Sequence, residues 1–169
     1  NAAYYWKGAR NPRQTLVDWD TYFYPLDAIL DWNRIYGRRG LAQFQCVLPL
    51  AASRSGLKKL LEATSAAGQG SFLAVLKRFG GQQSCFSFPM EGYTLALDFP
   101  VNQKTLALME QLDRIAVEHG GRFYLAKDAR MSAETFSKSD SRVPEFRTLR
   151  QHLSFSGRFS SAQSERLGL

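Results

Sequence analysis

Hydrophobic and polar side chains alternate along several short stretches of this chain, and such alternation is typical of β-strands that face a core on one side. The four stretches are residues 41–49, 71–79, 93–99 and 122–126. A loop of glycine, glutamine, serine and proline covers residues 80–91, between the second and third strands. It is too long for a tight hairpin, so we expect it to bind or to cover something.

Two helices are expected between these strands. Leucines recur at helical spacing over residues 53–67, with Ser53 as the N-cap. A second amphipathic helix is expected from its cap Asn102 to His119, where a glycine pair ends it. The order β-α-β-β-α-β is the ferredoxin-like arrangement. We therefore predict an α+β fold, with an antiparallel sheet, both helices on one face and a helical C-terminal tail.

Both ends of the chain depart from this pattern. The opening segment is aromatic and irregular, and we expect it to cover another part of the protein rather than to be a solvated linker; its first two residues, Asn1-Ala2, look like the remnant of a removed tag. Pro25 suits the first turn of a helix that is expected to reach Tyr36. In the tail, Ser132 signals a helix start, and the residues from Pro144 can form another helix.

The predicted domain organisation follows from these patterns. It comprises residues 1–24 as a lead-in, 25–126 as the central domain and 127–169 as a tail. The tail pieces, including a serine-rich stretch over 154–164, form no obvious core of their own. We expect the chain to be a fragment of a longer protein.

Parity along the strands sorts the residues onto two unlike faces of the sheet. The apolar face, which we expect the helices to cover, holds Ala42, Phe44, Cys46, Leu48, Phe72, Ala74, Leu76, Tyr93, Leu95, Leu97 and Phe99. The other face, called the open face below, holds Leu41, Gln43, Gln45, Val47, Leu73, Val75, Lys77, Phe79, Thr94, Ala96 and Asp98. A few polar groups on an apolar wall are typical of a ligand surface.

Lys77 is the most unusual residue of the open face. A lysine between Val75 and Phe79 is costly to desolvate unless an anion or a hydrogen-bonding group meets it. Either its stem carries the ammonium out to water, or this face receives a polar ligand. An open antiparallel face is often simply solvated, but these apolar neighbours favour a covered one.

Composition narrows the function only partly. With 169 residues, 44% hydrophobic and 22% charged, the chain fits one globular domain or part of a larger protein. Its net charge of +7 predicts a phosphate, nucleic-acid or acidic-membrane partner, or else a solvated basic surface. Cys46 and Cys85 lack zinc-site or disulfide-framework spacing, and Cys46 is expected to be a buried thiol in a reducing compartment. No apolar run is long enough to span a bilayer, and no signal-peptide pattern opens the chain.

Several motifs occur together in this chain. They include Phe23-Tyr24-Pro25-Leu26-Asp27, Asp31 to Gly37, Gln43-Phe44-Gln45, Ser71 to Gly80, Ser87-Phe88-Pro89, Gly92-Tyr93, Asp98-Phe99-Pro100 and Gly120 to Asp128. In combination they resemble the C-terminal part of FAD-linked oxidases of the vanillyl-alcohol-oxidase superfamily, which includes the aldonolactone oxidases. The likeness runs from about Tyr22 to Leu169.

The resemblance implies a substrate-binding, or cap, domain whose sheet closes over the isoalloxazine ring of FAD. It implies that FAD is held mainly by an N-terminal domain absent from this chain, and that the tail packs on that domain. The implied reaction is oxidation of a CH–OH group of a sugar, sugar lactone or polyprenyl-phosphate-linked sugar by hydride transfer to flavin. A short-chain reductase partner and a cytoplasmic location with peripheral membrane association are also implied.

The resemblance also implies roles for individual residues. Substrate binding is implied for Gln43, Gln45, Val75, Lys77, Phe79, Thr94 and Ala96, and flavin contact for Tyr124 and Lys127. Thr94 and Ala96 stand where the family pocket has an asparagine and a cysteine, which leaves the exact substrate open. No metal is implied.

Lys77 and Lys127 are the implied catalytic groups. Either cation can hold a substrate oxygen or stabilise the negative charge of reduced flavin, and the base for the hydroxyl proton is assigned to neither. For Asp128, pairing with a basic neighbour is favoured over a part in the chemistry.

Two other functions are compatible with the predicted fold. An RNA-binding module would stack bases on aromatic side chains of the central strands, but Thr94, Ala96 and Asp98 occupy those positions in the third strand. A small-molecule-binding regulatory domain would bind its ligand without flavin. The oxidase interpretation predicts instead that this chain alone is colourless and inactive.

Overall fold

The structure, a computed structural model, describes all residues except 1, 11–13, 15, 25–26, 83 and 154–157. The chain divides into two compact units, Asn1–Ile35 and Tyr36–Leu169. The first unit contains the helices α1 (Ala2–Ala9) and α2 (Trp19–Phe23). None of the α2 side chains is buried. That the aromatic residues of this unit cover another part of the protein stays a prediction.

The prediction of a helix from Pro25 to Tyr36 is wrong for the residues of this segment that the structure describes. Asp31 adopts the left-handed backbone conformation, with φ of 54°, which interrupts a right-handed helix. Only Trp32–Tyr36 is helical, as the short 3-10 helix η1. Pro25, the expected first helical residue, lies outside the described residues.

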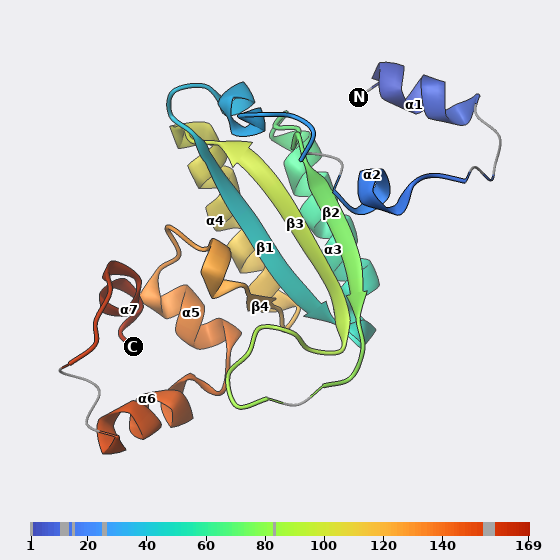
Figure 1. The fold of residues 1–169 in the computed structure, drawn as a ribbon. Helices are drawn as coiled ribbons and strands as arrows, with labels where there is room; N and C mark the ends of the chain where they lie inside the picture. Colours follow the sequence, from blue (N-terminus) through green and yellow to red (C-terminus); the bar gives the residue numbers. More distant parts are fainter. Residues whose placement is uncertain (1, 11–13, 15, 25–26, 83, 154–157) are drawn as a thin grey trace. The chain divides into compact units, whose positions relative to one another are not determined.

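The second unit is built on one antiparallel sheet with the strand order β2-β3-β1-β4. Its strands are β1 (Leu41–Pro49), β2 (Ala74–Phe79), β3 (Gly92–Pro100) and β4 (Arg122–Phe123). The helices α3 (Leu50–Ala66) and α4 (Gln103–Glu118) lie on the same side of this sheet (Figure 1). This arrangement confirms the predicted α+β, ferredoxin-like fold.

The strand register confirms the two predicted faces. Gln45 of β1 is paired with Ala96 of β3, which is paired with Val75 of β2. In the next open-face row, Thr94 lies between Val47 and Lys77. Directly paired residues point to the same side of a sheet, so each row stays on one face. The opposite face supplies Phe44, Cys46, Leu48, Leu95, Leu97 and Phe99 to the hydrophobic core.

Coverage of the apolar face is incomplete at its edge strand. Phe72 and Leu76 are 64% and 55% exposed, and Ala74 is exposed as well. These three residues were expected to lie under the helices, and that prediction is wrong. The physical reason is that α3 packs on the two central strands, β1 and β3, and α4 packs on β1. In the core, Cys46 is fully buried as predicted, and burial raises its pKa to about 12.

The two helix starts have different outcomes. Ser53 does not cap α3, because the helix already begins at Leu50; the Ser53 hydroxyl instead donates to the carbonyls of Leu48 and Pro49, at 2.9 and 2.8 Å. For α4 the prediction is confirmed, since Asn102 accepts from the Thr105 N–H in a capping box.

The chain after α4 is less regular than predicted. The fourth strand covers two residues only, and the 3-10 helix η2 (Leu125–Lys127) follows it. Then come α5 (Ala133–Ser139), which Ser132 caps as predicted, α6 (Val143–His152) and α7 (Ala162–Leu167). The last helix was not predicted.

The tail shares the core of the sheet. Met131, Phe136, Val143 and Leu167 are buried in the same hydrophobic cluster as the strand residues. Packing of other tail surfaces on a flavin domain stays a prediction. No helix in the described part of the chain is both long and apolar enough to cross a membrane.

Candidate functional site

A cavity of about 650 Å³ opens beside the loop-proximal end of the open face. Four segments form it: the strands β1 and β2, the loop at residues 86–89, the chain from β4 into η2, and the chain from α5 to Arg142. Five residues implied as site residues line it together, namely Gln45, Lys77, Phe79, Tyr124 and Lys127. They come from positions as far as 82 residues apart, and the fold brings them to one place.

The two lysines of this cavity are available to a ligand. Both side chains are exposed. Within the described residues, no carboxylate lies at ion-pair distance from Lys77 or Lys127. Lys77 lies on the edge strand β2, next to the buried Thr94 of β3. Its aliphatic stem therefore carries the ammonium past the edge of the sheet into water. The cavity thus holds two lysine cations that no carboxylate of the described residues neutralises.

Four other implied residues lie outside the lining of the cavity. Thr94 is 1% exposed and accepts a hydrogen bond from Gln45 Nε2 at 3.2 Å, so it orients the side-chain amide of Gln45. Val75 and Ala96 lie in the Gln45 row of the sheet. Gln43 donates to the Asp98 carboxylate. For these four residues, direct substrate contact stays a prediction.

Asp98 is a buried carboxylate that the sequence patterns placed on the open face without a partner. Besides Gln43, it accepts from the Tyr36 hydroxyl at 3.3 Å. Burial, with the charge of Asp98 and the hydrogen bond to it, raises the pKa of Tyr36 to about 12. The Tyr36 ring also meets Phe72 edge to face at 5.3 Å. These contacts fasten the start of the second unit to the sheet.

Aromatic rings form one wall of the cavity. Phe88, from the loop, stacks on Tyr124 with ring centroids 4.8 Å apart and meets Phe79 edge to face at 5.9 Å. The sequence identified the loop as a segment that binds or covers. No role in the site was predicted for Phe88 itself, because its ring partners belong to distant segments, β2 and the chain after β4.

Asp128, next to Lys127, is held by local partners, as favoured from the sequence. Its carboxylate accepts from the backbone N–H groups of Arg130 and Met131, at 3.0 and 2.8 Å, and from Arg166 at 2.7 Å. Burial acts to raise its pKa, but these donors outweigh burial and hold the pKa of Asp128 below its ordinary value. Asp128 therefore anchors η2 rather than facing a ligand.

Acid should destabilise the folded chain through Asp128 and Asp140. Asp140 is buried between Arg122 and Arg142; burial acts to raise its pKa, but hydrogen bonds from Arg142 and the charge of Arg122 hold it below its ordinary value. A carboxyl whose pKa is lower in the folded state stabilises that state above its unfolded pKa, about 4 for aspartate. We expect the free energy of unfolding, measured with urea, to fall as pH drops from about 5 through this value.

A variant provides the control for this pH dependence. Asp128→Asn should be less stable than the parent at neutral pH and should lose less stability on acidification. Asp113 acts in the opposite sense, because burial raises its pKa despite the bonds from Arg130. A urea midpoint that is unchanged between pH 6 and pH 3 would contradict the contribution of the two anchored carboxylates.

Comparison with known proteins adds sequence relatives to this geometry. No family model matches the chain. It is 38% identical to decaprenylphosphoryl-beta-D-ribose oxidase of Mycolicibacterium smegmatis over 161 residues, which make up 95% of this chain and 34% of that protein. It is 32% identical to an uncharacterized protein in the mprA 5′ region of Streptomyces coelicolor over 144 residues, or 83% of this chain and 39% of that protein.

The chain thus spans between a third and two fifths of the length of these curated relatives. The aligned region reaches over nearly all of the chain, including the sheet, the cavity and the tail. The resemblance that the motifs predicted is therefore confirmed: over 95% of its length this chain is similar to part of an oxidase, decaprenylphosphoryl-beta-D-ribose oxidase.

Proposed function

We propose that this chain is the substrate-binding part of an FAD-dependent oxidoreductase that oxidises a sugar hydroxyl. The observation that carries the proposal is the single cavity in which Gln45, Lys77 and Phe79 of the sheet meet Tyr124 and Lys127. Its similarity to an oxidase of a lipid-linked ribose supports the same assignment. FAD would be bound mainly by a further part of a longer protein.

The residues of the cavity fit the edge of a flavin. The exposed Lys127 ammonium has no carboxylate partner within the described residues, and the aromatic Tyr124 precedes η2 by one position. A cation at this place would stabilise negative charge on a reduced ring, and an aromatic side chain would pack against it. When bound, the flavin supplies the hydride acceptor.

Lys77 and Gln45 would orient the sugar. The Gln45 amide donates one hydrogen to Thr94, which fixes its orientation and leaves its carbonyl oxygen and second N–H for a ligand. The Lys77 ammonium can donate to a substrate oxygen, and the Phe79 and Phe88 rings would pack against the apolar face of the sugar. These groups position the reacting carbon and exclude water from one side of it.

The unpaired cations favour a phosphate-linked sugar over a neutral sugar lactone. We include in the proposal a polyprenyl-phosphate-linked sugar as substrate, a cytoplasmic protein attached peripherally at the membrane that holds this lipid, and a short-chain reductase that acts on the ketone product. Each of these parts depends on the oxidase assignment.

The proposal is tested with the intact product of the gene that encodes this chain. The purified protein should be yellow, and denaturation should release FAD. Under anaerobic conditions a polyprenyl-phosphate-linked ribose should bleach the flavin, whereas free ribose should bleach it much more slowly. Absence of flavin from the intact protein would overturn the proposal. Flavin without bleaching by any sugar would overturn the substrate assignment alone.

A further inference from the structure

Asp140 is a buried carboxylate at the end of α5; it is not among the residues implied for the site, but it lines the cavity together with Arg122 and Arg142. It is 4% exposed. The Arg142 guanidinium donates to both of its oxygens, from Nε at 2.8 Å and from Nη2 at 2.6 Å. Arg122 Nε lies 3.3 Å from Oδ2 without the alignment of a hydrogen bond, so this second contact is an ion pair only. One carboxylate thus orients two arginines.

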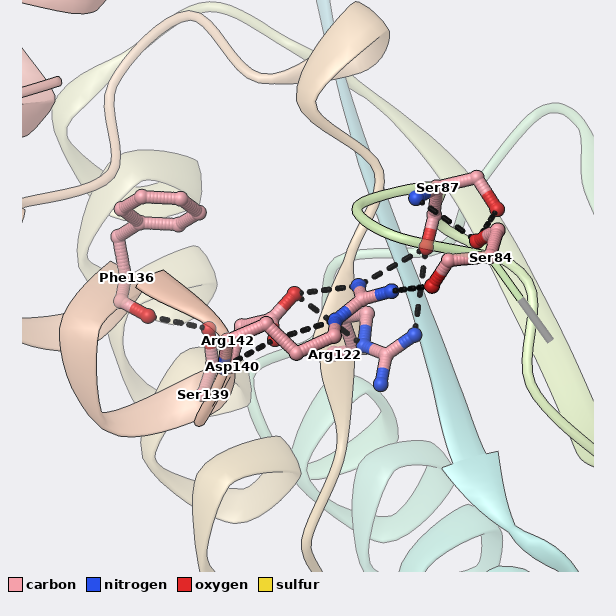
Figure 2. A network of polar contacts seen from close by, with 7 residues as sticks. All are labelled: Ser84, Ser87, Arg122, Phe136, Ser139, Asp140 and Arg142. Atoms are coloured by element: carbon pink, nitrogen blue, oxygen red, sulfur yellow. Dashed lines mark hydrogen bonds and ion pairs between the residues drawn. The ribbon is translucent and has the colours of Figure 1, made fainter. Parts of the chain in front are cut away.

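Both arginines also donate hydrogen bonds to the backbone of the loop at residues 84–89 (Figure 2). Arg142 donates to the carbonyl oxygens of Ser87 and Ser84, at 2.9 and 3.3 Å, and Arg122 donates to the Ser87 carbonyl at 3.2 Å. The loop and Asp140 are more than 50 residues apart in the chain. The two arginines that pair with a tail carboxylate thus also bind the backbone of a loop that connects β2 and β3.

Aromatic packing joins the same parts of the chain. Phe86 of the loop stacks on Phe146 of α6, with ring centroids 4.1 Å apart and an interplanar angle of 6°. The Arg142 guanidinium lies over the Phe86 ring, 5.4 Å from its centroid. Two residues further along, Phe88 reaches the cavity and stacks on Tyr124. The position of Phe88 in the cavity wall thus depends on how the preceding residues are held.

We propose that Asp140, through Arg122 and Arg142, is a positioning group that holds loop 84–89 so that Phe88 forms a wall of the cavity. The physical reason is charge. With the carboxylate present, the arginines share one anion and can keep their hydrogens on the loop carbonyls. Without it, two guanidinium groups would repel each other in a partly buried place. The assignment of the cavity to a sugar rests on the proposed function, whereas the restraint on the loop does not.

Hydrogen exchange of the 169-residue chain tests the restraint directly. In Asp140→Asn, peptides covering residues 84–89 should exchange about tenfold faster than in the parent, because local opening of the loop becomes easier. Peptides from α3 should keep their rates. Asp113→Asn is the matched control, since it also removes a buried carboxylate that binds an arginine bidentately but does not touch the loop.

A milder variant covers the case in which Asp140→Asn fails to fold. Arg142→Gln leaves the Asp140–Arg122 pair in place and removes the guanidinium hydrogen bonds from Arg142 to Ser84 and Ser87. The Arg122 bond to Ser87 remains in this variant, so loop exchange should accelerate less than in Asp140→Asn. Equal loop exchange in the parent, Arg142→Gln and Asp113→Asn would overturn the proposal, as would loop exchange that rises to the same extent in all variants.

Kinetics of the intact flavoprotein test the consequence for the cavity. Asp140→Asn should raise KM for the sugar about tenfold, with flavin content unchanged and kcat lowered less than KM is raised. Phe88→Ala should reproduce this KM change without changing exchange near Arg142. Faster loop exchange without any KM change would overturn the role of Phe88 in the wall. Absence of sugar oxidation in the parent would refute the proposed function and leave the exchange result to decide the restraint.

Discussion

Replacing Lys77 with alanine is expected to lower the rate of sugar oxidation by the intact flavoprotein on the order of a hundredfold, the size of effect seen when one preorganised donor is removed. Lys77 lines the cavity, its side chain is exposed, and no carboxylate of the described chain pairs with it. Its ammonium is therefore free to donate to a substrate oxygen. The measurement is kcat/KM for the sugar, with the flavin content of each preparation determined after denaturation.

Arg78→Ala is the matched control for this variant. Arg78 is the next residue of β2, also exposed and also positively charged, but parity points it to the opposite side of the sheet. Its removal should leave kcat/KM and flavin content unchanged. Lys77→Arg should recover part of the activity, because it restores a cation with a different shape. Full activity of Lys77→Ala would exclude this lysine from substrate orientation.

Parity alone was enough to place Lys77, Phe79 and Gln45 on one face. This works because the side-chain period of a strand is two, so an apolar core on one side determines the direction of every residue. The register then showed which residues pair across the sheet, joining Gln45 to Ala96 and Val47 to Thr94. Local chemistry was sufficient for the Asn102 cap of α4 in the same way, since cap and partner are three residues apart.

Contacts between distant segments could not be predicted from these local patterns. Asp140 lies at the end of the tail helix α5 and Ser87 lies in a loop, so neither residue belongs to a periodic sequence pattern that could predict its partner. Parity also gives the direction of a side chain without its depth, which is why Leu76 was expected to be covered although its strand lies at the sheet edge. Thr94 shows the converse: it is on the open face and yet buried.

Gly92→Ala is expected to prevent stable folding of the chain, with a loss of more than about 4 kcal/mol in the free energy of unfolding. Gly92 opens β3 with φ of 156°, a conformation that residues with a side chain rarely adopt. A Cβ atom there would lie 1.9 Å from the carbonyl oxygen of Leu48 and 3.2 Å from the backbone nitrogen of Leu50. Both atoms belong to the junction of β1 with α3, so neither can move without displacing the central strand. Circular dichroism and thermal unfolding of the purified chain measure the effect.

Gly80→Ala tests whether this loss comes from the site or from glycine replacement in general. Gly80 stands at the other end of the same loop, directly after β2, and a Cβ atom there meets nothing within 4 Å. Its φ lies outside the left-handed region. Alanine at this position should change stability by no more than about 0.5 kcal/mol, because it adds no clash and slightly restricts the unfolded chain. If both variants unfolded at the same temperature as the parent, the close approach of Gly92 to the β1–α3 junction would not limit stability. If both failed to fold, the cause would be a general need for glycine at the two ends of the loop and not the clash at Gly92.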